Sequence, residues 1–432
     1  MYSITNANTI IFNPKFNKPL DPELLSNYKK IIFSNYQLSN NLFEAYENNN
    51  FDNLKWIWNN SKFNQPLANS FENLTSLTHL TFGYYFNQPL NNSLGSLTSL
   101  THLTFGEYFN QPLTNSLESL TSLTHLTFCG YFNQPLANSL DKLTSLKQLN
   151  LGEYFNEPLS NSLDKLTSLT HLTFCFYFNQ PLNNSLWSLT SLNYLTFCYH
   201  FNQPLGNSLE SLTSLTHLTF YGYFNQPLAN SLVNLTSLTH LTFNGNFNQP
   251  LEDSLDKLTS LKYLTFDVCI FNQPLYNSLE SLTSLTHLTF NYYFNQPLTN
   301  SLDSLKSLTH LTLGYCFNQK DDLPSNIKSI NINCNNLFYI DFLPSNIEEI
   351  ELETHFNLEL NNLPSSIKKI SFCKESNYNK ELNCLPSGLE ILQLPEKYKL
   401  QIKNIPKGLK KLICSKNYQF INDFAGLEVE TY

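Results

Sequence analysis

Eight histidines recur at one position of an internal repeat, and they are the residues of this sequence best placed to do chemistry. Each is the third residue of a Leu-Thr-His-Leu-Thr string, and they are His79, His102, His125, His171, His217, His240, His287 and His310. Imidazole binds metals, transfers protons and changes charge near neutral pH. On neighbouring strands about 4.8 Å apart, charged rings would repel one another. We therefore predict lowered histidine pKa values and a loss of stability on mild acidification.

The histidine column permits three interpretations. It is a solvated strand face copied by repeat duplication, a flat imidazole and hydroxyl surface for a protein or glycan partner, or a metal site. No carboxylate or thiolate occupies the same position in neighbouring repeats, which disfavours the metal site. The predicted binding face combines the eight histidines with threonines two residues further on and with tyrosines of the variable triplet before each Phe-Asn pair. These are Thr81, Thr104, Thr127, Tyr84, Tyr85, Tyr108, Tyr223 and Tyr292. Aromatic residues are typical of protein contacts, although these tyrosines could instead pack on the next turn.

Three cysteines, Cys129, Cys175 and Cys198, share a second repeated position. Cys175 and Cys198 fall in adjacent repeats, so they could form a disulfide or bind zinc together with His200. The chain has no Cys-x-x-Cys motif, however, and free thiols are the favoured interpretation. The sequence shows no nucleophile–base pair, glycine-rich phosphate loop or carboxylate cluster. We therefore expect a protein that is not an enzyme, with no catalytic residues, cofactor or metal.

The element that must position these residues is a repeat of 23 residues. Phe-Asn-Gln-Pro-Leu, once with Glu157, begins at eleven positions that are 23 residues apart except for one interval of 24. The starts are Phe63, Phe86, Phe109, Phe132, Phe155, Phe178, Phe201, Phe224, Phe247, Phe271 and Phe294. Phe16 and Phe317 begin weaker copies, and Phe51, Leu54 and Ile57 keep the apolar phase before Phe63.

One repeat predicts a short strand followed by a return segment. Around Leu80 and Phe82, apolar residues alternate with polar ones, as in a half-buried strand. Pro89 keeps the return segment out of a sheet, and Asn92 begins a single helical or 3-10 turn. The repeated asparagine at Asn64 should bond to neighbouring backbone, and the phenylalanine columns should form the core. One unit buries too little to be stable, so copies must stack. The predicted fold is a repeat solenoid, a curved leucine-rich-repeat-like stack of short parallel strands with irregular or 3-10 return segments.

Four segments are expected along the chain. Residues 1–62 form a degenerate N-terminal cap with partial repeats, and 63–317 form the 23-residue array. Residues 318–415 repeat every 20 to 22 residues from Leu-Pro-Ser strings at Leu323, Leu343, Leu363 and Leu385. Residues 416–432 form a C-terminal cap.

Two kinds of string in this sequence resemble the FNIP repeat: the Phe-Asn-Gln-Pro-Leu strings and Leu-Pro-Ser-Ser-Ile-Lys-Lys-Ile-Ser-Phe at 363–372. The FNIP repeat is a relative of the leucine-rich repeat and is abundant in social amoebae and in large viruses that infect amoebae. The resemblance covers roughly residues 63–415. Some members of that family place an F-box before the array, which would imply substrate recruitment to a ubiquitin ligase. Residues 20–28 faintly resemble an F-box start, but Asn40–Asn50 is polar and lacks its apolar helical pattern.

The composition excludes several classes of function. Only 14% of residues are charged, all 25 cationic residues are Lys, and the net charge is −9, which disfavours nucleic-acid and anionic-membrane binding. No apolar run is long enough to span a membrane, and the N-terminal segment lacks the features of a signal peptide. The nine cysteines are scattered along the chain, which is typical of free thiols in a reducing compartment. We expect an intracellular, cytoplasmic protein (in the host cytoplasm if viral) that acts as a non-enzymatic protein interaction scaffold without a small-molecule substrate. The alternatives are a ubiquitin-ligase substrate receptor and, less favoured, a surface adhesion protein.

Overall fold

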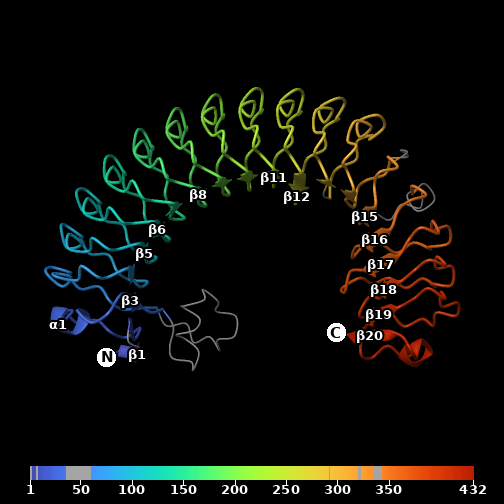
Figure 1. Cartoon of the computed structure of the whole chain (residues 1–432), viewed down its shortest axis with the longest axis horizontal. Helices are drawn as coiled ribbons and strands as arrows, with labels where there is room; N and C mark the ends of the chain where they lie inside the picture. The colour runs from blue at the N-terminus through green and yellow to red at the C-terminus, as the bar shows by residue number, and fades with distance from the viewer. Residues whose placement is uncertain (1, 6–7, 36–59, 291, 320–322, 334–342) are drawn as a thin grey trace. The chain divides into compact units, whose positions relative to one another are not determined.

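A computed structural model describes residues 2–5, 8–35, 60–290, 292–319, 323–333 and 343–432. The chain forms two compact units. Unit 1 comprises Met1–Leu215 and Phe220–Phe224, and unit 2 comprises Thr216–Thr219 and Asn225–Tyr432. In both units, each turn of the chain contributes a strand on one side and a longer return segment on the other (Figure 1).

The strands of unit 1 are three to four residues long. They are β1 (Tyr2–Thr5), β2 (Thr9–Phe12), β3 (Lys30–Phe33), β4 (His79–Thr81), β5 (His102–Phe105), β6 (His125–Phe128), β7 (Gln148–Leu151), β8 (His171–Phe174) and β9 (Tyr194–Phe197). β1 is antiparallel to β2, and from β2 to β9 each strand is parallel to the next. The one α-helix in the described part of the chain, α1 (Pro22–Leu25), lies between β2 and β3.

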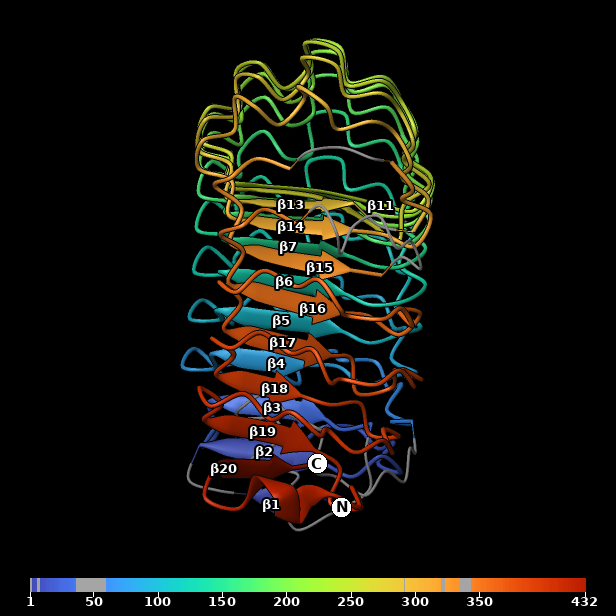
Figure 2. The same ribbon diagram turned by 90° about the vertical axis from the view of Figure 1, so that its right-hand side faces the viewer.

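Unit 2 repeats this arrangement over the second half of the chain. Its strands are β11 (His240–Asn244), β12 (Tyr263–Asp267), β13 (His287–Phe290), β14 (His310–Leu313), β15 (Ser329–Ile332), β16 (Glu349–Leu352), β17 (Lys369–Phe372), β18 (Ile391–Gln393), β19 (Lys411–Cys414) and β20 (Glu428–Thr431). Strand β10 (His217–Phe220) is divided between the two units. From β11 to β20 every neighbouring pair is parallel, and Figure 2 shows β15 to β20 as successive rungs.

The register of the strands follows the sequence repeat. In the β5–β6 pair, His102 faces His125, Leu103 faces Leu126 and Thr104 faces Thr127. The Leu and Phe positions are buried while the His and Thr positions are partly exposed, because successive side chains of a strand point to opposite faces. Equivalent residues therefore form continuous columns, and the predicted solenoid of short parallel strands is confirmed.

The core of each unit is built from stacked rings and leucines. In unit 1, Phe132 is fully buried and packs on Phe128 with ring centroids 3.9 Å apart. It also stacks on Phe109 and on Phe155, each at 6.1 Å. The phenylalanine columns are therefore core, as predicted.

The return segments are chains of tight turns. In the repeat that begins at Phe86, Ser93, Gly95 and Leu97 each donate a backbone hydrogen bond to the carbonyl three residues earlier. This is the 3-10 pattern, but it is interrupted too often to form a helix. Within the described residues, only η1 (Ile421–Phe424) is a 3-10 helix.

The N-terminal segment already follows the repeat. Phe16 stacks on Phe63 at 6.0 Å, and Asn17 Oδ1 accepts a hydrogen bond from the Asn64 N–H at 3.0 Å. Residues 20–28, which faintly resemble an F-box start, contribute the single turn of α1 on the return side, between two parallel strands. The expected partial repeat at Phe51, Leu54 and Ile57 lies outside the described residues.

An asparagine ladder connects the turns where the chain leaves each strand. Asn87 Oδ1 accepts hydrogen bonds from the Asn110 N–H at 2.9 Å and from Gln111 Nε2 at 3.0 Å. Asn110 Oδ1 does the same for Asn133 and Gln134 in the next turn. The predicted structural role of the column is confirmed: one carboxamide per turn satisfies donors that the bend would leave unpaired.

Replacing Asn87 by alanine is expected to lower the free energy of unfolding by about 1–2 kcal/mol, because the Asn110 N–H loses its acceptor in a partly buried site. Urea-induced unfolding followed by circular dichroism measures the change. Asn87→Asp is the control, because a carboxylate can still accept both bonds and should recover most of the loss at neutral pH. Equal stability of Asn87→Ala and the wild type would contradict the ladder's role.

Candidate functional site

The predicted histidines form stacks on the open face of the strands. In unit 1, His102 lies between His79 and His125, with ring centroids 4.2 Å apart on each side and ring planes within 8° of parallel. In unit 2, His287 stacks on His310 at 4.0 Å. Gln148 separates His125 from His171, and Tyr194 continues the column beyond His171, on which it stacks at 4.4 Å.

A threonine before each histidine fixes the position of the ring. Thr101 Oγ1 donates to the Thr78 carbonyl oxygen at 3.0 Å and lies 2.9 Å from His102 Nδ1. The hydroxyl's one hydrogen is used by the carbonyl, so Nδ1 is the protonated nitrogen and donates to Oγ1. The same pair of contacts occurs at His79, His125, His171, His240, His287 and His310. In the neutral ring, Nε2 then carries the lone pair that faces away from the backbone.

Burial in the stack makes the histidines hard to protonate. It lowers the pKa of His102 to about 4, and the neighbouring His79, His125 and Lys30 add to the effect. The pKa values of His125, His171, His240 and His287 are lowered for the same first reason, burial. For these five histidines the lowering agrees with the prediction, but desolvation comes before the repulsion between rings on which the prediction was based.

The threonine column lies beside the stack on the same face. Thr81, Thr104 and Thr127 are aligned across β4 to β6, and all three are partly exposed. Neither column contains a charged residue. The face is therefore polar and uncharged, with one imidazole and one hydroxyl per turn in β4 to β6 and with Gln148 and Asn150 at the same positions in β7.

An aromatic rim borders this face in unit 1. We use the name for the residues directly before each Phe-Asn pair, which are Tyr85, Tyr108, Tyr131, Tyr154, Tyr177, His200 and Tyr223. Neighbouring rings contact one another along the whole rim at centroid distances of 4.6–5.2 Å. Tyr108, Tyr131, Tyr154, Tyr177 and Tyr223 nevertheless remain 37–41% exposed.

The sequence left two possibilities for the tyrosines, packing on the next turn or exposure for contact with a partner. The rim tyrosines do both: they pack on the next turn and remain on the surface. The tyrosines one residue before this column do the same: Tyr84 packs against Tyr108 of the next turn at 5.3 Å, and in unit 2 Tyr292 stacks on Tyr315 at 5.0 Å while 38% exposed. Sequence reasoning omitted Tyr131, Tyr154 and Tyr177 from the candidate face. The signal was present, since every residue of this column from Tyr85 to Tyr223 has an aromatic side chain.

The cysteine column lies just behind the rim. All eight described cysteines, including Cys129, Cys175 and Cys198, are free thiols. Cys175 and Cys198 are in side-chain contact, whereas His200 stacks on Tyr177 at 4.8 Å. Among the described residues, no three His, Cys, Asp or Glu side chains are grouped as they would be around a metal ion.

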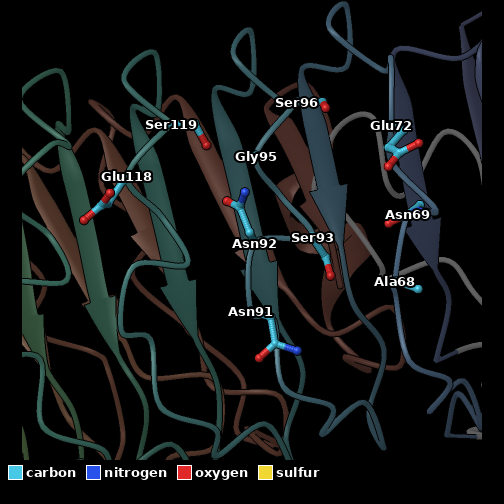
Figure 3. A pocket seen from close by; sticks show the side chains of 10 residues that line it. All are labelled: Ala68, Asn69, Glu72, Asn91, Asn92, Ser93, Gly95, Ser96, Glu118 and Ser119. Carbon is cyan, nitrogen blue, oxygen red and sulfur yellow. The ribbon is translucent and has the colours of Figure 1, made fainter.

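A polar hollow on the return side of unit 1 was not predicted. Asn69 and Glu72, Asn92 and Ser93, and Glu118 and Ser119 line it from three successive turns (Figure 3). None of these side chains is buried. The hollow is thus a surface trough between neighbouring turns, and it lacks a held polar group that would orient a ligand.

Comparison with known proteins identifies the family. The FNIP repeat profile matches residues 317–355 and 356–397. The crystal structure of CroV588, described as a novel circular LRR protein and coming from a giant virus, is 30% identical in sequence with a TM-score of 0.66. The match covers 96% of this chain and 67% of CroV588. The chain belongs to the FNIP-repeat family of leucine-rich-repeat proteins.

The fold of this FNIP-repeat protein extends to more distant structures. A leucine-rich-repeat protein of Leptospira interrogans is 18% identical with a TM-score of 0.52, over 87% of this chain and 93% of that one. No curated protein matches the sequence. In the described part of this FNIP-repeat protein, no helix has the length and apolar character needed to cross a membrane. Leucine-rich-repeat-like folds typically serve as scaffolds for protein interaction and are typically not enzymes.

Proposed function

We propose that this FNIP-repeat protein is a non-enzymatic interaction scaffold whose unit 1 binds a protein partner on the strand face and the aromatic rim. The observation that carries the proposal is the continuous column of exposed rings bordering an uncharged face. Rings such as Tyr131 and Tyr154 are already held by their neighbours at 4.6 Å, so binding would cost little side-chain entropy. Exposed, pre-ordered tyrosines are typical anchors of protein interfaces.

The charge distribution supports the same surface. Residues 63–317 contain only 6 Lys and 14 acidic residues, and the His and Thr columns contain none. A partner can therefore cover the His and Thr columns without removing water from an ionised group, whereas Glu107 and Glu153 directly precede the rim residues Tyr108 and Tyr154. Most neighbouring rim rings stack, as Tyr154 does on Tyr177 at 4.7 Å, while His200 meets Tyr223 edge to face, so that ring edges and hydroxyl groups remain for contact. This favours a protein over a saccharide, which would pack against open ring faces.

The test begins with proximity labelling by the full chain in its native host cell and continues with the purified candidate partner. A Tyr108→Ser/Tyr131→Ser/Tyr154→Ser variant is expected to weaken direct binding by about tenfold or more, because rim anchors are removed. Calorimetry measures the affinity.

The matched control is Trp187→Ser, which removes a 63% exposed aromatic side chain from the return side. Its affinity should equal that of the wild type. If the rim variant binds as tightly as the wild type, or if Trp187→Ser abolishes binding, the assignment of the surface is wrong.

A further inference from the structure

Cys175 and Cys198 occupy equivalent positions in adjacent turns. Each follows the last residue of its strand, and those residues, Phe174 of β8 and Phe197 of β9, are aligned. The ladder continues to the cysteines, because the Cys198 N–H donates to the Phe174 carbonyl at 2.9 Å. Neighbouring strands lie about 4.7–4.9 Å apart, which is inside the range of about 4.4–6.8 Å between Cα atoms that a disulfide requires.

The two thiols contact each other and differ in their surroundings. Cys175 donates its hydrogen to Asn150 Oδ1 at 3.0 Å and also forms a side-chain hydrogen bond with Cys198. Asn150 stands where most turns have threonine, so this acceptor is particular to the site. The bond with Cys198, burial and the Glu153 carboxylate raise the pKa of Cys175. When Cys198 is ionised, the Cys175 hydrogen can turn from Asn150 Oδ1 to the Cys198 sulfur, and this bond lowers the pKa of Cys198 against the opposing effect of burial.

We propose that Cys175 and Cys198 form a peroxide-responsive thiol pair that closes reversibly into a disulfide. Cys198 is the reacting thiol, because its neighbour stabilises its thiolate. Cys175 is the resolving thiol, because it contacts Cys198 from the equivalent position of the adjacent turn and its own pKa is raised. Both side chains are only partly buried, so a small oxidant can reach them.

The reaction is balanced with peroxide as the oxidant. The Cys198 thiolate attacks one peroxide oxygen, an S–O bond forms, the O–O bond breaks, and the departing hydroxide takes a proton to become water. Cys198 is then a sulfenic acid, oxidised by two electrons. The Cys175 sulfur attacks the Cys198 sulfur, an S–S bond forms, the S–O bond breaks, and the departing hydroxide leaves as water with the Cys175 proton. Two thiols and one peroxide give one disulfide and two waters.

The disulfide would tie together two turns directly beside the rim residues Tyr177 and His200. Phe176 and Tyr199, the residues after the two cysteines, stack with centroids 4.8 Å apart and planes within 2° of parallel. Both rings are exposed. Closing the bond fixes their spacing without moving the strands, since the backbone is already paired at this position.

Cys129 provides an internal control in the same column. The residue in the next turn is Gly152, so Cys129 has no thiol beside it, and Cys175 is two strands away. Two strand spacings exceed the distance that a disulfide can bridge. Burial, with Glu107 and Glu153, raises the pKa of Cys129 to about 11, so little of it is thiolate near neutral pH.

The test treats the reduced full chain with hydrogen peroxide at neutral pH and maps the cysteines by mass spectrometry, after cleavage at aromatic residues. The expected result is a 175–198 cross-link that dithiothreitol reverses, with Cys129 still reduced. At low reagent concentration, Cys198 should be alkylated about tenfold faster than Cys129, in keeping with its larger thiolate fraction.

Two variants assign the roles. In Cys175→Ser, Cys198 should stop at the sulfenic acid and be trapped by dimedone, whereas Cys129→Ser should form the cross-link as the wild type does. The wild-type result and its internal control do not depend on either variant folding. The proposal is overturned if both cysteines stay reduced when Cys129 oxidises, or if the only disulfides formed join two chains.

Discussion

Acidification from pH 7.5 to pH 5 is expected to lower the thermal unfolding temperature of the protein by about 5 °C, equivalent to about 2 kcal/mol for units of about 200 residues. Five histidines contribute in the same direction, namely His102, His125, His171, His240 and His287. The expected loss is modest for five groups because their rings are partly exposed and solvent screens their charges.

The sign follows from the proton balance. In the unfolded chain, histidine binds a proton near pH 6.5, whereas His102 in the folded chain does so only near pH 4. Below about pH 6.5, the unfolded chain therefore holds more protons, and stability falls with falling pH until the folded rings also titrate. The groups that face His102 are His79, His125 and Lys30, and none of them is an anion that would offset the effect.

Other titrations are separable from that of the histidines. Glu348 and Glu390 have pKa values lowered by hydrogen bonds from lysines, so these carboxylates remain ionised over most of this pH range. The pKa of Glu107 is raised by burial and by Glu153, and its proton uptake on folding opposes the loss. The net change should still follow the histidines, because they are more numerous.

The chain itself suggests the control variant. Tyr194 and Tyr263 occupy histidine positions and keep the stack, at 4.4 Å from His171 and 4.3 Å from His240. A His79→Tyr/His102→Tyr/His125→Tyr variant should therefore fold and lose less stability between pH 7.5 and 5, because His102 and His125 no longer contribute while His171, His240 and His287 still do. Thermal melts recorded by circular dichroism give both slopes. A wild type with flat melts, or a variant as sensitive as the wild type, would refute the explanation.

Most of the fold follows from the repeat period. Because equivalent residues recur every 23 positions, an apolar triplet such as Leu77, Leu80 and Phe82 determines which face of each strand is buried. The same period places Asn87 beside Asn110 and so predicts the ladder. Columns are predictable in this way because a parallel stack keeps one register from turn to turn.

The features that sequence reasoning missed depend on contacts between columns. The Thr101–His102 hydrogen bond requires the hydroxyl to point at the previous turn, which the period alone does not show, although the Thr-His pair recurs. The half-burial of His102 arises from rings stacked at 4.2 Å, closer than the strand spacing that was assumed. Segment boundaries at residues 62, 317 and 415 stay a prediction.

Replacing Phe132 by alanine is expected to lower the free energy of unfolding of unit 1 by about 3–5 kcal/mol, the largest effect of any substitution considered. The ring is fully buried and packs on Phe128 at 3.9 Å, and it stacks on Phe109 and Phe155 in the turns before and after. Its loss opens a cavity at two interfaces between turns. Since each turn is stabilised by its neighbours, the damage should spread beyond its own repeat.

Urea unfolding measures this effect, and amide hydrogen exchange shows its extent. Exchange should accelerate in the strands on both sides, β6 and β7, and much less in β3, because the interfaces of β3 do not include Phe132. Tyr131→Ala is the matched control: it removes a neighbouring ring that is 40% exposed, and its expected cost is about 1 kcal/mol. If the two substitutions cost the same, the buried phenylalanine column does not hold the turns together, and the stability of the stack must come from its backbone and asparagine ladders instead.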